Sequence, residues 1–185
     1  MKKKNLKRTL LAVLVGSAIL LTSFFEEGTL VDKMNRYGMS VSDSTPSMQM
    51  YNSTCKYAEM YDVPKEYAFG LSYEETRYKG PADTTYFAGH VSPCGALGPN
   101  QVMYSTAKLY VNDTEKLSKK LLKYDIDFNV RISMRILADL KKTYKTWPKA
   151  LGAYHTGKPI VDWYSKKITK KTYITKWVNL DFFKS

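Results

Sequence analysis

Apolar side chains recur at helical spacing through most of the chain after residue 48. The first such segment covers residues 49–61, where apolar and aromatic residues return every three or four positions. A second helix is predicted over residues 62–76, because Asp62 can cap its start and Pro64 falls in its first turn. Gly80 and Pro81 then stop it. Residues 82–100 are rich in glycine and proline, which predicts a loop or a short hairpin.

The helical pattern resumes after this loop. A helix is predicted over residues 101–110, and another over residues 127–144, where apolar side chains step by four and form one buried stripe. Pro148 opens a further helix, and Gly157 is placed to end it. The predicted fold class is therefore mostly α, with any sheet confined to the loop between the second and third helices.

The first 48 residues have a different character. Residues 1–8 carry five positive charges, and residues 9–25 form an uncharged, mostly apolar run. This pattern is typical of a signal peptide or a signal anchor, and the poor match to a cleavage site favours an uncleaved anchor. Residues 26–48 are polar and rich in serine, which indicates a tether. We therefore expect the domain outside the cytoplasm, in the periplasm or elsewhere in the cell envelope, membrane-anchored or secreted.

The net charge of +12 is unevenly distributed. Residues 26–140 hold 13 Lys and Arg against 15 Asp and Glu, whereas residues 141–185 hold 11 against 2. A cationic C-terminal segment suits anionic wall polymers or lipid head groups, although such a segment is also compatible with a simple solvated face. The export signal argues against nucleic acid as a partner.

Cysteine and histidine are scarce. Cys55 and Cys94 are the only cysteines, and in an oxidising compartment they predict a disulfide, with two buried thiols as the alternative. Only two histidines are present, so no metal site is predicted, and no cofactor is expected.

Three segments carry candidate chemistry. Residues 70–78 read GLSYEETRY, residues 92–103 read SPCGALGPNQVM, and residues 150–157 read ALGAYHTG. Taken alone, the first is a helix end with two acids, and helical spacing does not choose between Glu74 and Glu75.

Together and in this order, the three segments resemble the active site of the soluble lytic transglycosylases, within the lysozyme-like superfamily that also holds the goose-type lysozymes. In this family the catalytic acid is the Glu of an ESxF motif, the second motif reads SPxGAxGLMQVM, and the third reads ALAAYNxG. The resemblance implies a lysozyme-like helical domain over residues 49–165, followed by a basic, aromatic tail over residues 166–185. It also implies that Glu75 is the general acid and that Glu74 is its solvated neighbour.

The same resemblance implies a set of substrate-binding positions. Gln101 corresponds to the family's glycan-binding amide, and Tyr154 to the tyrosine that reaches the catalytic acid and orients it. Three further candidates differ from the family residues: Thr76 and Tyr78 stand for Ser and Phe, and His155 stands for Asn. Asn100 occupies a position where Met is usual, and it completes the candidate set.

The family cleaves the bond between N-acetylmuramic acid and N-acetylglucosamine in peptidoglycan. One Glu acts first as acid and then as base, and the muramic acid's own 6-hydroxyl attacks to give a 1,6-anhydro end. The alternatives are a hydrolytic muramidase of the same fold and a wall-binding protein without turnover. Small tethered members serve secretion machines, conjugation machines or phages, and the sequence does not choose among these partners.

Overall fold

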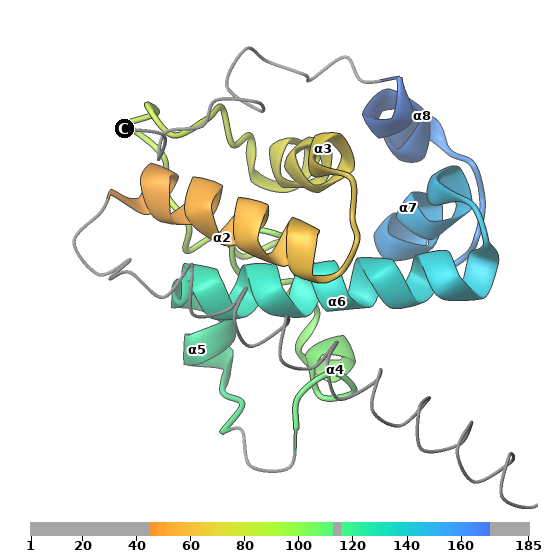
Figure 1. Ribbon diagram of the computed structural model, residues 1–185. Coiled ribbons are helices and arrows are strands. Elements are labelled where there is room, and N and C mark those ends of the chain that lie inside the picture. Colours follow the sequence, from red (N-terminus) through yellow and green to blue (C-terminus); the bar gives the residue numbers. More distant parts are fainter. Residues whose placement is uncertain (1–44, 113–115, 171–185) are drawn as a thin grey trace, which may run out of the picture. The chain divides into compact units, whose positions relative to one another are not determined.

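α6 (Ile126–Tyr144), the longest helix among the described residues, makes the most extensive contacts with other helices. The computed structural model describes residues 45–112 and 116–170 (Figure 1). α6 begins where the Asp125 side chain accepts a hydrogen bond from the Phe128 amide, and it ends at Lys145, whose φ is 67°. Its buried face includes Phe128, Ile132 and Ile136, so the predicted helix and its apolar stripe are confirmed.

Two helices precede the loop. α2 (Pro46–Met60) packs on α6, and α3 (Lys65–Thr76) packs on α2. α2 begins three residues earlier than predicted, because the Thr45 side chain caps it and Pro46 occupies its first turn. The last residues assigned to the tether are therefore helical.

α3 ends at Thr76 as predicted, but its start and the signal that stops it differ from the prediction. Asp62 does not cap this helix; it adopts a φ of 54° in the turn after α2, and Pro64 occupies the N-cap. The C-cap is Arg77, which takes the left-handed conformation with a φ of 60°, before Gly80 and Pro81 are reached.

The middle of the chain contains no strand within the described ranges. The loop is held by two isolated bridges, which pair Leu97 with Val91 and with Val102. Two short helices follow. α4 (Tyr104–Ala107) covers only part of the helix predicted over residues 101–110, and α5 (Lys119–Tyr124) was not predicted. The mostly helical class is confirmed, and the expected hairpin is reduced to these bridges.

The last described helices form one side of the site. α7 (Trp147–Thr156) packs on α6 and ends at Gly157, as predicted. α8 (Trp163–Thr169) packs on both α7 and α3. α8 spans residue 165, where the sequence placed the boundary between the domain and the tail.

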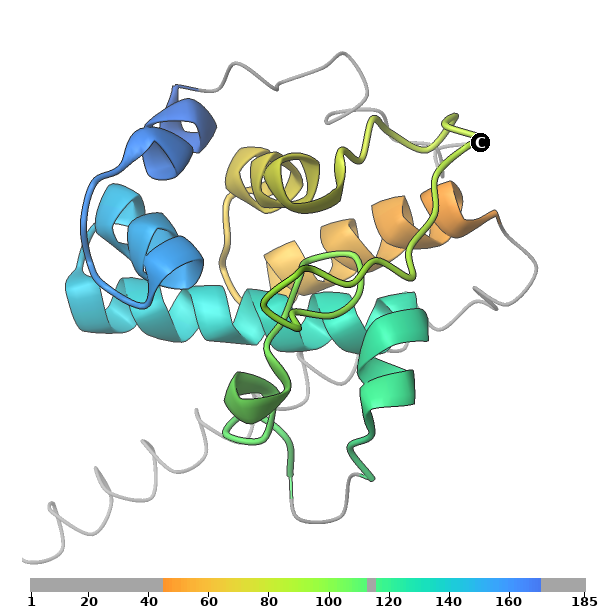
Figure 2. The same ribbon diagram turned by 180° about the vertical axis from the view of Figure 1, so that it is seen from behind.

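The core is divided by α6. One cluster of buried side chains joins α2, α3, α7 and α8 to α6, and a second, smaller cluster lies under α4 and α5. Both views show α3 and α5 on opposite sides of α6 (Figures 1 and 2).

The predicted disulfide is not present. Cys55 and Cys94 are free thiols. Cys55 packs partly against the core on α2, while Cys94 faces solvent in a tight turn closed by the Gly95 amide and the Ser92 carbonyl.

The predicted export segment, residues 26–44 of the tether and the tail beyond residue 170 lie outside the described residues. Among the helices of the described part, none has the length and apolar character needed to cross a membrane.

Candidate active site

Glu75 lies in the last turn of α3, and the packing of this helix fixes its position. Ala68, Leu71 and Ser72 on the same helix are buried. Rotating α3 would expose this surface, at a cost of about 25 cal/mol for each Å² of apolar area. The carboxyl group is therefore presented by a rigid element.

The facing wall of the site is α8, which comes close to α3 at Gly70. A Cβ atom at this glycine would lie 2.9 Å from Cγ2 of Ile168. Because Gly70 has no side chain, the two helices approach closely. Tyr164, one turn before Ile168, thereby reaches the end of α3.

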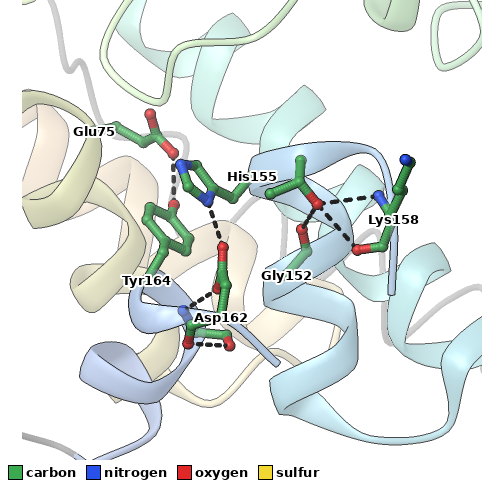
Figure 3. Close-up of polar contacts among 8 residues, drawn as sticks. Glu75, Gly152, His155, Lys158, Asp162 and Tyr164 are labelled. Carbon is green, nitrogen blue, oxygen red and sulfur yellow. Dashed lines mark hydrogen bonds and ion pairs between the residues drawn. The ribbon is translucent and has the colours of Figure 1, made fainter. Parts of the chain in front are cut away.

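Tyr164 donates its hydroxyl proton to Oε1 of Glu75 at 2.5 Å (Figure 3). Burial raises the pKa of Glu75 from 4.5 to about 7, the Tyr164 hydrogen bond and His155 lower it, and Glu74 raises it further. Burial and the charge of Glu75 raise the pKa of the Tyr164 hydroxyl well above its usual range, so this group remains a donor. A carboxyl group with these properties is half protonated near neutral pH and can act as a general acid.

The tyrosine that contacts Glu75 is not the one predicted. The Tyr154 hydroxyl donates to the backbone oxygen of Asn100 at 2.7 Å, so it supports the loop. It still lies within electrostatic range of Glu75, whose charge is one cause of its raised pKa. Tyr164 was missed because it follows the last motif, on a helix of only seven residues. The one local signal is Asp162 with Ser165, a pattern that caps a helix start.

Glu74 is not the solvated neighbour that the sequence suggested. Its side chain is only 1% exposed and lies 3.6 Å from Arg77 and 3.9 Å from Lys167. These two cations face the carboxylate from α3's C-cap and from α8. Glu74 therefore forms a charge cluster with Arg77 and Lys167 beside Glu75.

Asn100 is a buried hub and not a surface residue. Its side chain accepts a hydrogen bond from Ser72 at 2.9 Å and donates one to Ser133 at 2.7 Å. Its backbone amide donates to the Asn129 side chain at 3.0 Å. Fully satisfied buried amides of this kind specify one arrangement of the surrounding elements. Asn100 thus joins α3, α6 and α7, and the partners on α6 were not foreseen.

Gln101, the predicted glycan-binding amide, follows this hub directly. It has a φ of 48°, and its side-chain nitrogen donates to the Gly98 carbonyl at 2.7 Å. The loop before it is tight, because a Cβ atom at Gly98 would lie 2.4 Å from the Asn129 side chain. The position of Gln101 is therefore set by contacts with α6.

Two other predicted binding residues are buried. Tyr78 is wholly inaccessible and donates its hydroxyl proton to the Ser47 carbonyl at 2.8 Å. Thr76 lies under the loop, with its hydroxyl 2.8 Å from the Pro99 carbonyl oxygen. In this structure both residues are core and loop supports, and a sugar ring cannot stack on Tyr78.

His155, the remaining predicted residue, lies beside Glu75. Its Nδ1 is 2.6 Å from Oδ2 of Asp162, and its ring stacks on Tyr164 with centroids 4.5 Å apart. Figure 3 shows the imidazole between the carboxyl groups of Glu75 and Asp162. Asp162 was not predicted as a site residue.

One comparison with known proteins gave a match. A family model described as the transglycosylase SLT domain matches residues 52–176, which cover the three motifs and α8. No curated protein and no solved structure matches the chain significantly.

Proposed function

The chain belongs to the transglycosylase SLT domain family, and on this premise we propose that it is a peptidoglycan lytic transglycosylase with Glu75 as its single catalytic carboxyl group. The bond cleaved is the β-1,4 bond between N-acetylmuramic acid and N-acetylglucosamine. The observation that carries the proposal is the buried Glu75 carboxyl group, with its raised pKa of about 7 and its hydrogen bond from Tyr164.

In the first step, protonated Glu75 donates its proton to the glycosidic oxygen. The bond between that oxygen and the anomeric carbon of the muramic acid breaks, and positive charge develops on the sugar ring. Glu75 is now a carboxylate, and it remains hydrogen-bonded to Tyr164. Hydrogen bonds to the charged form stabilise it, so the same contact that orients the acid also supports the carboxylate.

In the second step, the Glu75 carboxylate takes the proton from the 6-hydroxyl of the muramic acid. The hydroxyl oxygen bonds to the anomeric carbon and closes the 1,6-anhydro ring. Glu75 ends the cycle protonated, as it began, and no water is consumed. The balance of atoms needs no second carboxyl group.

The surroundings of Glu75 support this one-carboxylate scheme. Most glycosidases pair their acid with a second carboxylate across the sugar. Glu74 is buried against Arg77 and Lys167, and Asp162 is engaged by His155 and by the start of α8. Both acids near the site are thus held by other groups.

The alternative is a hydrolytic muramidase, and one observation favours keeping it. A carboxylate and imidazole pair next to a catalytic acid could orient a water molecule as nucleophile. Digestion of purified peptidoglycan in water enriched in heavy oxygen separates the two reactions. The proposal predicts anhydro-muropeptides that carry no heavy oxygen at the new end. Reducing ends labelled with heavy oxygen would establish the muramidase, and no release at all would favour a wall-binding protein.

We further propose that residues 1–25 export the domain and anchor it, so that it acts in the cell envelope next to the membrane. The polar residues that follow would then give the domain reach toward the wall. A secretion, conjugation or phage machine is the kind of assembly that such a tethered enzyme would serve.

A further inference from the structure

The segment that joins α7 to α8 lies directly against α7 at Gly152. A Cβ atom at this glycine would lie 1.7 Å from the carbonyl oxygen of Ile160, which no side chain tolerates. The Thr156 hydroxyl fastens the start of the same segment, 2.8 Å from the Gly152 carbonyl oxygen and 3.1 Å from that of Lys158. Gly152 thus allows the segment to return across the helix toward the site.

This return places Asp162 beside His155. One carboxylate oxygen of Asp162 accepts a hydrogen bond from the Ser165 amide at 2.9 Å and caps α8, and the other meets Nδ1 of His155 at 2.6 Å. Burial opposes the charge of Asp162, but hydrogen bonds from Ser165 and His155 hold its pKa below the usual range. The carboxylate is therefore a fixed anion that orients the imidazole.

The oriented imidazole contacts the residue that holds Glu75. Its ring lies nearly parallel to that of Tyr164, with an angle of 9° between the planes. The exposed Trp163 ring meets the imidazole edge-on, with the two ring centroids 5.4 Å apart. Because Nδ1 is engaged by Asp162, the other ring nitrogen is directed toward Glu75 (Figure 3).

We propose that His155 is a positioning residue that holds Tyr164 against Glu75 and sets the protonation of the catalytic carboxyl group. Asp162 orients the imidazole, and Gly152 permits Asp162 to approach it. This inference rests on the proposed function, because it concerns the proton that Glu75 donates and recovers. His155 stands where the family motif has Asn, so the device distinguishes this chain from the common pattern.

The sign of the effect follows from the charges that face Glu75. Glu74 on α3 carries negative charge, Tyr164 on α8 donates a hydrogen bond, and His155 on α7 contributes positive charge when protonated. Removing the imidazole therefore favours the protonated form of Glu75. The alkaline limb of the pH–rate profile, which reports loss of the Glu75 proton, should therefore move to higher pH.

The test compares pH profiles of kcat/KM for anhydro-muropeptide release by the full-length chain and its variants. His155→Asn should move the alkaline limb upward by on the order of half a pH unit. Asp162→Asn should move it in the same direction, because Asn still caps α8 but no longer presents a fixed anion to the imidazole. His90→Asn is the matched control, since it removes the other histidine of the chain, and its profile should overlay that of the parent.

A second readout does not need turnover. Carbon-13 labelled glutamate side chains are titrated by NMR, with Glu75 assigned by the signal lost in Glu75→Gln. The proposal expects the Glu75 midpoint to move upward in His155→Asn. An unmoved midpoint, or a rate reduced equally at every pH, would overturn it. If the parent releases no product, the proposed function fails, and the NMR titration alone still decides the role of the pair.

Discussion

At the scale of single residues, the account depends on one carboxyl group and the hydroxyl that orients it. Tyr164 is buried in the core, with 2% of its surface exposed, and its hydroxyl donates a hydrogen bond to Glu75. Catalytic groups must be held within about half an ångström of the productive position. Tyr164 supplies this restraint, and Tyr154 restrains the loop instead.

The first prediction separates these two tyrosines. Tyr164→Phe removes the hydrogen bond to Glu75 while keeping the ring, so kcat should fall by about 10 to 100-fold with little change in KM. Tyr154→Phe removes a hydrogen bond to the Asn100 backbone and should mainly lower stability, by about 1 kcal/mol. The measurements are steady-state kinetics and thermal unfolding of both variants. A larger kinetic loss in Tyr154→Phe than in Tyr164→Phe would contradict this assignment.

The second prediction concerns pH. Glu75 must be protonated to act, and its pKa is raised to about 7 mainly by burial, so activity should fall as the pH rises through about 7. Glu74→Gln removes a negative neighbour and should move this fall to lower pH, opposite in sign to the effect expected for His155→Asn. Rates of product release between pH 5 and pH 9 would check both. An activity that rises continuously toward alkaline pH would contradict the role of Glu75.

The sequence predicts Glu75 as the candidate acid because Glu75 stands in a motif. Gln101, Tyr154 and His155 stand in ordered motifs as well. Burial is what the sequence could not predict. Tyr78 and Asn100 have polar atoms that suit a sugar, but their donors and acceptors are used inside the fold, by Ser47 for Tyr78 and by Ser72 and Ser133 for Asn100. Such pairing depends on contacts between residues about 30 positions apart or more, which a linear pattern does not contain.

At the scale of elements, the site is the place where the ends of α3, α7 and α8 meet. Two glycines permit the approach, Gly70 between α3 and α8, and Gly152 between α7 and the segment that follows it. They differ in what a side chain would strike. At Gly70 it meets Cγ2 of the Ile168 side chain at 2.9 Å, whereas at Gly152 it meets the Ile160 backbone at 1.7 Å.

The third prediction follows from this difference. Gly152→Ala forces the Ile160 backbone to move, so it should destabilise the fold by about 2 kcal/mol or more and disturb the Asp162–His155 pair. Gly70→Ala is the matched comparison and should cost less, because the contact with the Ile168 side chain is less severe and the better helix propensity of Ala, about 1 kcal/mol, offsets part of it. Chemical denaturation of both variants gives the comparison. Equal effects of the two substitutions would count against the close approach at Gly152.

Long periodic helices were predictable and short ones were not. α6 has 19 residues and a continuous apolar stripe, so its pattern is clear in the sequence. α5 and α8 have six and seven residues, which is less than two full turns and leaves no periodicity to read. α8 carries Tyr164 and is capped by Asp162, so these two site residues were not predicted.

At the scale of the whole molecule, burial of the Glu75 carboxyl group lowers the stability of the fold at neutral and alkaline pH. The pKa of Glu75 is about 7 in the folded protein and 4.5 as its ordinary value. The folded state therefore binds this proton more tightly than the unfolded chain does. The stability gained from binding this proton is fully present below about pH 4.5 and is lost as the pH rises through about 7.

The fourth prediction is that Glu75→Gln gains stability only at higher pH. At pH 4 the variant and the parent should unfold alike, because Gln resembles the protonated acid. At pH 8 the variant should be more stable, by on the order of 2 kcal/mol, since it avoids a buried charge. Urea unfolding at the two pH values measures the difference. A variant that is less stable than the parent at pH 8 would show that the carboxylate is well accommodated and that burial does not raise its pKa.

The measurement that bears most directly on the central claim is mass spectrometry of the products released from purified peptidoglycan by the parent, Glu75→Gln and Glu66→Gln. Glu66 lies in the first turn of the same helix and serves as the matched acid. The account predicts anhydro-muropeptides from the parent and from Glu66→Gln, and none from Glu75→Gln. Anhydro products released by Glu75→Gln at the parental rate would contradict it.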